Sequence, residues 1–311
     1  MKSTPPLPLP ALRTLFGNRL QENVALRNYT TAQVGGVAGA LVIVQTAEEL
    51  RNAAQALWQM GVPFYVLGSG SNVLISDKGL QAVILINRAR TVKVSDHANE
   101  EPSVWAESGA NLSAIARQVA LRGLSGLEWA ASIPGTLGGA VYGNAGAHGS
   151  DMAHNLLLAE ILQPNQEPQS WTVEQMAYSY RSSALKASPH QAIILAARLK
   201  LSRSTPEQVK ATMQAMTERR RATQPPGASL GSMFKNPPGD YAGRLIEAAG
   251  LKGYRIGSAE VSPIHANFFV NHADTTANDV YQLIQHVRRT VLEKFNIELQ
   301  LEIELLGDFG E

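Results

Sequence analysis

Two serines in one short segment are candidates for chemistry. Residues 227–239 read GASLGSMFKNPPG, so Ser229 lies in a formal match to the G-x-S-x-G turn that exposes the nucleophile of serine hydrolases. That turn needs a strand before the serine and a helix after it. Here ATQPP (222–226) precedes it and NPPG (236–239) follows, so neither flank fits. We interpret the Ser229 match as coincidental, and the role of Ser232 stays open at this point.

Two glycine-rich runs could hold an anion. The first, Gly68-Ser-Gly-Ser-Asn72, follows an apolar run, and such a turn presents backbone N–H groups that can bind phosphate oxygens. It does not match G-x-G-x-x-G, because residue 73 is Val, and tight turns use the same residues. The second run is IPGTLGGAVYGNAGAHG (133–149). Together they suggest backbone wrapped around an extended anionic ligand, and an unusually irregular lobe is the alternative.

Composition excludes several classes of site. The absence of Cys rules out disulfides, thiolate metal sites, a Cys nucleophile and a cysteinyl cofactor link. The seven His residues do not cluster, so we expect no metal site. The net charge of +1 gives no global attraction to nucleic acid or to a membrane surface. The run Arg219 to Arg221 is typical of a solvated helix end, with phosphate contact as the alternative.

The elements that must position these residues can be predicted in part. Residues 41–44 read as a strand, TAEE (46–49) as a capping box that begins a helix ending at Gly61, and 62–67 as the next strand. This β-α-β unit leads directly into the first glycine-rich turn. We expect three further helices, over residues 112–121, from Thr205 to about residue 221, and over residues 276–296.

Residues 297–305 alternate strictly between apolar and polar side chains, which predicts a half-buried strand. Glu298, Glu302 and Glu304 share its polar face. By spacing alone, the pattern favours a solvent-facing position for all three.

Taken together, the motifs resemble those of the UDP-N-acetylenolpyruvoylglucosamine reductase (MurB) family over about residues 28–307. The likeness is to the shorter class of that family, which lacks an extra tyrosine-bearing insertion. The matching residues are, in chain order, Asn28-Tyr-Thr-Thr, Gly35-Gly36, Gly68-Ser-Gly-Ser-Asn-Val-Leu74, Gly126-Leu-Glu128, Ile133-Pro-Gly-Thr-Leu-Gly-Gly139, Asn144-Ala-Gly-Ala147, Tyr180-Arg181, Gly231-Ser-Met-Phe-Lys-Asn-Pro237, Ala242-Gly-Arg-Leu-Ile-Glu247, Val261-Ser262, His265-Ala-Asn267 and Glu302.

The resemblance implies an α+β fold. A two-lobed FAD-binding domain of the PCMH (vanillyl-alcohol-oxidase) type is expected over 21–203, and an α+β substrate-binding domain over 204–311. Residues 1–20, which are rich in proline, are expected to form a flexible arm, and prolines interrupt what would be the apolar region of a signal peptide. We expect a cytoplasmic monomer that binds neither nucleic acid nor membrane.

The resemblance also implies the cofactor and the reaction. Non-covalent FAD would be reduced by NADPH, and the flavin N5 would then pass hydride to the enolpyruvyl β-carbon of the UDP-sugar, with a proton added at the α-carbon. The residues expected to bind FAD are Gly68, Ser69, Gly70, Ser71, Asn72, Ile133, Pro134, Gly135, Thr136, Gly138, Gly139 and Gly146.

Three residues match the catalytic positions of the family. Ser232 matches its proton-donating serine. The resemblance therefore implies that Ser232 is a proton donor and not a nucleophile. Arg181 matches the arginine that stabilises charge building on the substrate carboxylate, and Glu302 matches the catalytic glutamate. Without the resemblance, Arg181 reads as a surface arginine after Tyr180.

The residues expected to bind the substrate are Tyr180, Lys235, Asn236 and His265. Four positions depart from the usual family pattern: His148, Thr223, Met233 and Leu301. Thr223 stands where some members have Lys, so the cation that meets the substrate phosphates stays open, with Arg220 or Arg221 as candidates.

Two other functions are compatible with parts of the sequence. One is an oxidase or dehydrogenase of the wider PCMH group, against which residues 231–237 and the Glu302 segment argue. The other is a non-catalytic module that binds a UDP-sugar or another nucleotide.

Overall fold

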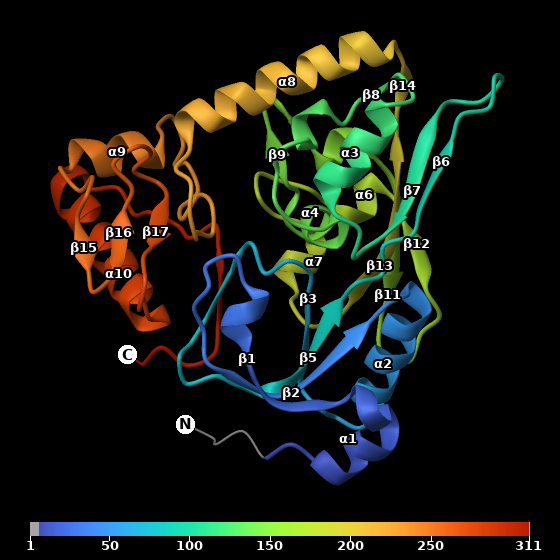
Figure 1. The fold of residues 1–311 in the computed structure, drawn as a ribbon, viewed down its shortest axis with the longest axis horizontal. Helices are drawn as coiled ribbons and strands as arrows, with labels where there is room; N and C mark the ends of the chain where they lie inside the picture. Colours follow the sequence, from blue (N-terminus) through green and yellow to red (C-terminus); the bar gives the residue numbers. More distant parts are fainter. Residues whose placement is uncertain (1–5, 311) are drawn as a thin grey trace.

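A computed structural model describes residues 6–310 of the chain. Its elements form three parts, and the long helix α8 (Pro206–Thr223) runs from the second part to the third (Figure 1). Within residues 6–310, none of the helices is long and apolar enough to cross a membrane.

The first part is built on a four-stranded sheet in the order β1-β2-β5-β3. Parallel β2 and β3 lie on either side of β5, and helix α2 begins at Thr46, whose side chain accepts a hydrogen bond from the Glu49 amide. The predicted β-α-β unit is therefore present. The elements of this part are α1 (Leu9–Phe16), β1 (Gln21–Ala25), β2 (Val37–Val44), α2 (Ala47–Gln59), β3 (Phe64–Leu67), β4 (Val73–Ile75) and β5 (Leu80–Asn87).

The N-terminal segment differs from the flexible arm expected over 1–20. Helix α1 has Pro in its first turn, where a missing N–H costs no helical hydrogen bond. Its residues Leu12 and Phe16 are buried in the core formed with α2 and β2. The expectation of an arm is therefore wrong for residues 9–16, and its residues 1–5 lie outside the described residues.

The second part has an antiparallel five-stranded sheet in the order β12-β11-β13-β7-β6. Helix α3 begins at Asn111, which caps it, and packs into the core of this part together with α4. The elements are β6 (Val92–Ser95), β7 (Ser103–Glu107), α3 (Leu112–Ala120), β8 (Leu124–Ser125), α4 (Leu137–Gly143), β9 (Gly146–Ala147), β10 (Ser150–Asp151), α5 (Met152–Asn155), β11 (Leu156–Leu162), β12 (Gln169–Trp171), α6 (Val173–Met176), α7 (Ala184–Ala187), β13 (Ile193–Lys200) and β14 (Ser202–Arg203).

The third part contains a small antiparallel sheet, β15-β16-β17, against helix α10, which a Thr276–Asp279 capping box begins. Asp77, from the first part, also accepts hydrogen bonds from the Ala277 and Asn278 amides at the start of α10. These bonds fix the third part on the first. Its elements are α9 (Ala242–Ala248), β15 (Arg255–Ile256), β16 (Ala259–Val261), β17 (Phe269–Asn271), α10 (Ala277–Phe295) and β18 (Glu304–Leu306).

The strand expected over 297–305 is only partly correct. Regular pairing is limited to β18, which lies parallel to β4, and Leu301 forms an isolated bridge to Phe234. Leu299 and Ile303 are buried, so the apolar positions do face the core. The alternation predicted the buried positions Leu299 and Ile303 correctly, but the backbone bends at residues 302 and 303, and most of the segment has no neighbouring strand of matching length.

We expect Leu12→Ala to lower the free energy of unfolding by about 3 kcal/mol, because the Leu12 side chain is 0% exposed and its loss leaves a cavity. Leu15→Ala on the same helix, where the side chain is 39% exposed, should cost less than about 0.5 kcal/mol. Urea unfolding followed by circular dichroism measures both. Equal, small losses would mean that α1 is not packed on the protein.

Candidate active site

The end of the chain is held against the first glycine-rich turn. The Glu304 amide donates to the Asn72 carbonyl oxygen at 2.8 Å, and the Asn72 side-chain amide donates to the Glu302 carbonyl oxygen at 3.2 Å. The parallel pairing of β18 with β4 begins at this point. A residue 230 positions away in the sequence is thereby fixed beside the turn at 68–72.

A third segment lies along the same stretch of the C-terminal chain. The Glu302 amide donates to the Met233 carbonyl oxygen at 2.9 Å, and the Lys235 amide donates to the Gln300 carbonyl oxygen at 2.8 Å. On its other side this segment pairs with Phe268 through Ser232. Ser232 is therefore held by backbone pairing one residue from the position that binds Glu302.

Arg181 reaches Glu302 from a tight turn. Its Nε donates to Glu302 Oε1 at 2.7 Å and its Nη2 donates to the Gly146 carbonyl oxygen at 2.9 Å. Ser179 and Ser182 exchange backbone hydrogen bonds across the turn, which holds Arg181 at a φ of 56°. A non-glycine residue in this left-handed region carries strain, and such strain is common where a side chain must be aimed.

The Glu302 side chain is largely removed from water, with 18% of it exposed against 24% for Arg181. Burial raises the pKa of the Glu302 carboxyl, because the charged form loses hydration. The positive charges of Arg181, Lys186 and Lys235 act in the opposite direction and lower that pKa. The carboxyl is thus poised between two opposing effects, which is a common feature of functional sites.

The two glycine-rich runs contact each other. Ser71 Oγ donates to the Pro134 carbonyl oxygen at 3.4 Å, and a Cβ placed on Gly68 would lie 2.3 Å from Thr136 Oγ1. Within residues 6–310, the backbone amides of 69–71 donate to no protein acceptor. Gly135, with a φ of 130°, lies opposite Ser71. These amides and hydroxyls form a cradle of the kind that binds a dinucleotide pyrophosphate.

The remaining predicted FAD-binding residues belong to the second glycine-rich run and are held by contacts within the second part. Thr136 caps α4 by accepting from the Gly139 amide, and the Gly138 amide donates to the Ser108 carbonyl oxygen. The Ile133 amide bonds within its own turn, to Ala130. Gly146 contacts Arg181 through its carbonyl, which connects the second glycine-rich run to the carboxylate site.

Of the predicted substrate-binding residues, Tyr180, Lys235 and Asn236 lie at the site. The Asn236 amide donates to the Tyr180 hydroxyl at 3.4 Å, and the guanidinium of Arg181 lies 5.5 Å from the Tyr180 ring centre. The Nδ1 of His265 accepts from the Asn267 amide, and its ring packs on Phe268, the residue that pairs with Ser232. Burial lowers the pKa of His265, so the ring is favoured in its neutral form.

The four departures from the family pattern lie on different elements. Met233 and Leu301 belong to the paired backbone segments, and Met233 is buried. His148 has a φ of 54° in the turn between β9 and β10, and burial, then the charges of Arg219 and Arg220, lower its pKa. Thr223 is the last residue of α8. Arg220 and Arg221 lie in the last turn of that helix.

Sequence reasoning missed a second ion pair beside the first. Glu304 was expected to be a solvent-facing residue, yet its Oε1 lies 2.7 Å from Lys186 Nζ. Glu298 does fit that expectation, since its side chain is 72% exposed and pairs with Arg288. The two-residue spacing of Glu302 and Glu304 was the available signal, because it keeps the two carboxylates close together along the chain.

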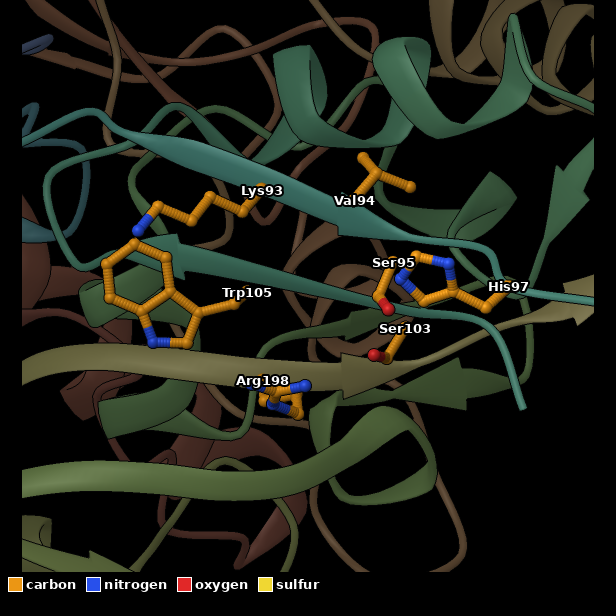
Figure 2. A pocket seen from close by; sticks show the side chains of 7 residues that line it. All are labelled: Lys93, Val94, Ser95, His97, Ser103, Trp105 and Arg198. Carbon is orange, nitrogen blue, oxygen red and sulfur yellow. The ribbon is translucent and has the colours of Figure 1, made fainter. Parts of the chain in front are cut away.

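A separate hollow lies on the open face of the five-stranded sheet. Figure 2 shows Lys93 and Arg198 on either side of Trp105, with His97 at the end where β6 and β7 diverge. Lys93 Nζ lies 5.1 Å from the Trp105 ring centre, and Trp105 Nε1 donates to Glu160. The hollow shares no lining residue with the Arg181–Glu302 site.

Comparison with known proteins agrees with this geometry. Residues 38–168 match the family described as "FAD binding domain", and residues 223–306 match "UDP-N-acetylenolpyruvoylglucosamine reductase, C-terminal domain". The UDP-N-acetylenolpyruvoylglucosamine reductase of Chloroflexus aggregans is 41% identical over 92% of this chain and 97% of its own. That of Bacillus subtilis is 40% identical over 92% and 94%.

A solved structure is similar along nearly the whole chain. The crystal structure of UDP-N-acetylenolpyruvylglucosamine reductase (MurB) from Thermus caldophilus superposes with a TM-score of 0.79, at 36% identity, over 93% of this chain and 99% of that one. The fold and the glycine-lined cradle define an FAD-dependent oxidoreductase with a separate C-terminal domain. More specifically, the chain belongs to the UDP-N-acetylenolpyruvoylglucosamine reductase family.

The expected fold class is confirmed by these findings: an α+β protein in which an FAD-binding domain precedes the reductase C-terminal domain. FAD is the cofactor of this class, and the residues of the cradle fit it. The boundary expected at residue 204 stays a prediction.

We expect Gly70→Ala to reduce FAD binding. A Cβ at Gly70 would lie 2.2 Å from the Tyr29 carbonyl oxygen, so the turn must move. Gly61→Ala is the matched control, because Gly61 has a similar φ, 62° against 59°, with open space around it. Both variants should lose about 1 kcal/mol of unfolding free energy through backbone strain, and Gly70→Ala should lose more because of the contact with Tyr29.

The ratio of flavin to protein absorbance after purification measures the difference between the two variants. Only Gly70→Ala should lose flavin. Equal flavin content in the two variants would contradict the placement of the pyrophosphate at this turn.

Proposed function

We propose that this protein reduces UDP-N-acetylenolpyruvoylglucosamine to UDP-N-acetylmuramate, with NADPH as the electron source, in the synthesis of peptidoglycan precursors. Bound FAD supplies the hydride, which it takes from NADPH and gives to the enolpyruvyl group. The observation that carries the proposal is the 2.7 Å contact between Arg181 and Glu302 at the edge of a glycine-lined cradle, in a chain of this family.

Arg181 is proposed to bind the carboxylate of the enolpyruvyl group. A guanidinium keeps its charge at any working pH and presents donors in a planar fork that matches a carboxylate. Two of those donors are already directed, Nε to Glu302 and Nη2 to Gly146, so the plane of the group is fixed before the substrate binds. Negative charge that builds on the substrate carboxylate then meets a positive charge that does not need to reorient.

Ser232 is proposed to give a proton to the α-carbon. Among the described residues its hydroxyl has no hydrogen-bond partner, and its backbone is held beside Phe268. A serine hydroxyl is a weak acid, but a carbon that carries the charge of an enolate is a strong base, so the transfer is favourable. The proton lost from the hydroxyl must be restored before the next cycle.

Glu302 is proposed to act in the same proton transfer. Its amide is bound to the residue after Ser232, which keeps the two segments in register, and burial raises the pKa of its carboxyl. A carboxyl of raised pKa holds a proton closer to neutral pH than a solvated one does. Glu302 and Arg181 also stabilise each other, so neither charge is buried without a partner.

Tyr180, Lys235 and Asn236 are proposed to bind the UDP-sugar outside the reacting group. Lys235 brings a cation to a site whose substrate carries phosphates, and the Tyr180 ring is 54% exposed, with room for a ligand. Arg220 or Arg221 remains the candidate that would meet the phosphates from α8. We propose further that the protein acts as a monomer in the cytoplasm.

We expect Ser232→Ala to leave the reduction of FAD by NADPH nearly unchanged. The reoxidation of reduced flavin by the enolpyruvyl UDP-sugar should slow by at least about 100-fold, because only this second step needs the proton. Anaerobic stopped-flow absorbance of the flavin separates the two steps. Ser229→Ala is the matched control and should alter neither. Equal slowing of both steps by Ser232→Ala would contradict the proton-donor role.

A further inference from the structure

A second, largely buried ion pair lies next to the Arg181–Glu302 contact. Lys186 Nζ lies 2.7 Å from Glu304 Oε1, and the two side chains are 16% and 37% exposed. The Lys78–Asp308 pair has the same separation and also ties the end of the chain to the first part, but its side chains are 61% and 54% exposed. The burial of Lys186 therefore needs an explanation that the Lys78 pair does not.

The two buried pairs are arranged side by side. Glu302 and Glu304 are two residues apart, at the bend that leads into β18, and their carboxylates meet Arg181 and Lys186 respectively. Arg181 and Lys186 come from one short segment, the tight turn and the helix α7 that follows it. One segment therefore carries two cations, and the C-terminal segment carries the two carboxylates that meet them.

Lys186 and Glu304 are both fixed through their backbones. Ser183 accepts a hydrogen bond from the Lys186 amide and donates its own hydroxyl proton to the Tyr142 carbonyl oxygen at 2.6 Å. The Glu304 amide is bound to Asn72 at 2.8 Å. The backbones of both residues are therefore held, and the ammonium group lies 2.7 Å from Glu304 Oε1.

Stability alone does not account for this pair. Removing two charges from water costs about as much as their attraction returns, so a buried pair contributes little to folding compared with apolar residues of the same size. A fixed charge beside a reacting carboxyl, in contrast, changes how readily that carboxyl holds its proton. Lys186 has a position suited to the second role.

The charged and titratable groups around Glu302 come from several elements. Arg181 contacts it, Lys186 and Lys235 lie near enough for their charges to lower its pKa, and Glu304 faces Lys186. Tyr142 is the remaining titratable group, and burial, followed by the charge of Glu304, raises its pKa to about 12. The phenol is therefore neutral at working pH, and Lys186 is a cation near Glu302 that is paired with a carboxylate of its own.

We propose that Lys186, held in place by Glu304, is a positioning residue that acts through Glu302 by supplying a second fixed positive charge beside that carboxylate. Lys186 touches neither substrate nor cofactor in this role. The inference rests on the proposed function, which gives Glu302 a part in proton transfer. Its consequence is that Lys186 sets the pH range over which Glu302 changes its protonation state.

The direct test is the titration of Glu302 in the FAD-bound protein. Carbon-13 NMR of protein labelled at the glutamate δ-carbons reports each carboxyl, and the signal of Glu302 is the one that Glu302→Gln removes. In Lys186→Met this signal should titrate about one pH unit higher than in the parent, because an opposing charge has been removed. Lys186→Arg should restore the parent midpoint, and Lys78→Met, the exposed matched control, should leave it unchanged.

A second readout follows the flavin. The rate of flavin reoxidation by the enolpyruvyl UDP-sugar is measured against pH, and the limb of the profile that is absent in Glu302→Gln is assigned to Glu302. In Lys186→Met this limb should move to higher pH by the same amount as the NMR midpoint. If Lys186→Met does not fold, Lys186→Gln with Glu304→Gln removes both charges together. This double variant should move the midpoint in the same direction, since the charge of Lys186 lowers the pKa of Glu302.

An unmoved Glu302 midpoint in a folded Lys186 variant would overturn the inference. This result is distinct from failure of the proposed function: if Glu302→Gln itself left flavin reoxidation unchanged, the assignment of Glu302 would be at fault rather than that of Lys186. A loss of thermal stability in Lys186→Met without a change in either midpoint would mean that the pair is structural, which also contradicts the inference.

Discussion

The site depends on a contact between a partly buried carboxylate and a partly buried guanidinium that are 121 positions apart in the sequence. Neither group is stable in the interior alone, because a buried charge without a partner costs several kcal/mol. Arg181 requires a strained turn to reach this position, and Glu302 requires the last segment of the chain to run between the glycine-rich turn and residues 232–236. The rest of the architecture can be understood as the means of bringing these two groups together.

The glycine-rich turn at 68–72 serves two functions through different atoms. The amides of 69–71 have no protein acceptor within residues 6–310, whereas the carbonyl and side chain of Asn72 hold the C-terminal segment. The site for the cofactor pyrophosphate and the backbone of the catalytic carboxylate therefore share one short loop. Asp77, a few residues further on, fixes the start of α10 and with it the third part of the chain. A displacement of this loop would disturb cofactor and carboxylate together.

Local sequence signals were sufficient for much of the fold. The β-α-β unit, the helices capped by Thr46, Thr205 and Thr276, and the buried positions near the end of the chain all follow from caps and periodicity within a few residues. Helix α1 was missed because the proline-rich composition of this segment predicted a flexible arm, although proline is tolerated in the first turn of a helix. Its stability comes from Leu12 and Phe16 packing on distant residues, and no local pattern encodes that.

The site could not be predicted from periodicity. Alternation placed Glu302 and Glu304 on a polar face, but only the tertiary structure covers that face with Arg181 and Lys186. The resemblance to a family supplied Arg181, Ser232 and Glu302, and the structure then placed Arg181 against Glu302. The partner of Glu304 came from the structure alone, since nothing in the spacing of 186 and 304 relates them.

A double-mutant cycle on Arg181 and Glu302 tests the central claim most directly. The rate of flavin reoxidation by the enolpyruvyl UDP-sugar would be measured in Arg181→Met, Glu302→Gln and the double variant, with each rate taken after full reduction by NADPH. If the two groups act as a unit, the double variant is about as slow as the slower single variant. Losses that multiply across the two substitutions would contradict the account, because they would mean that the two residues act independently.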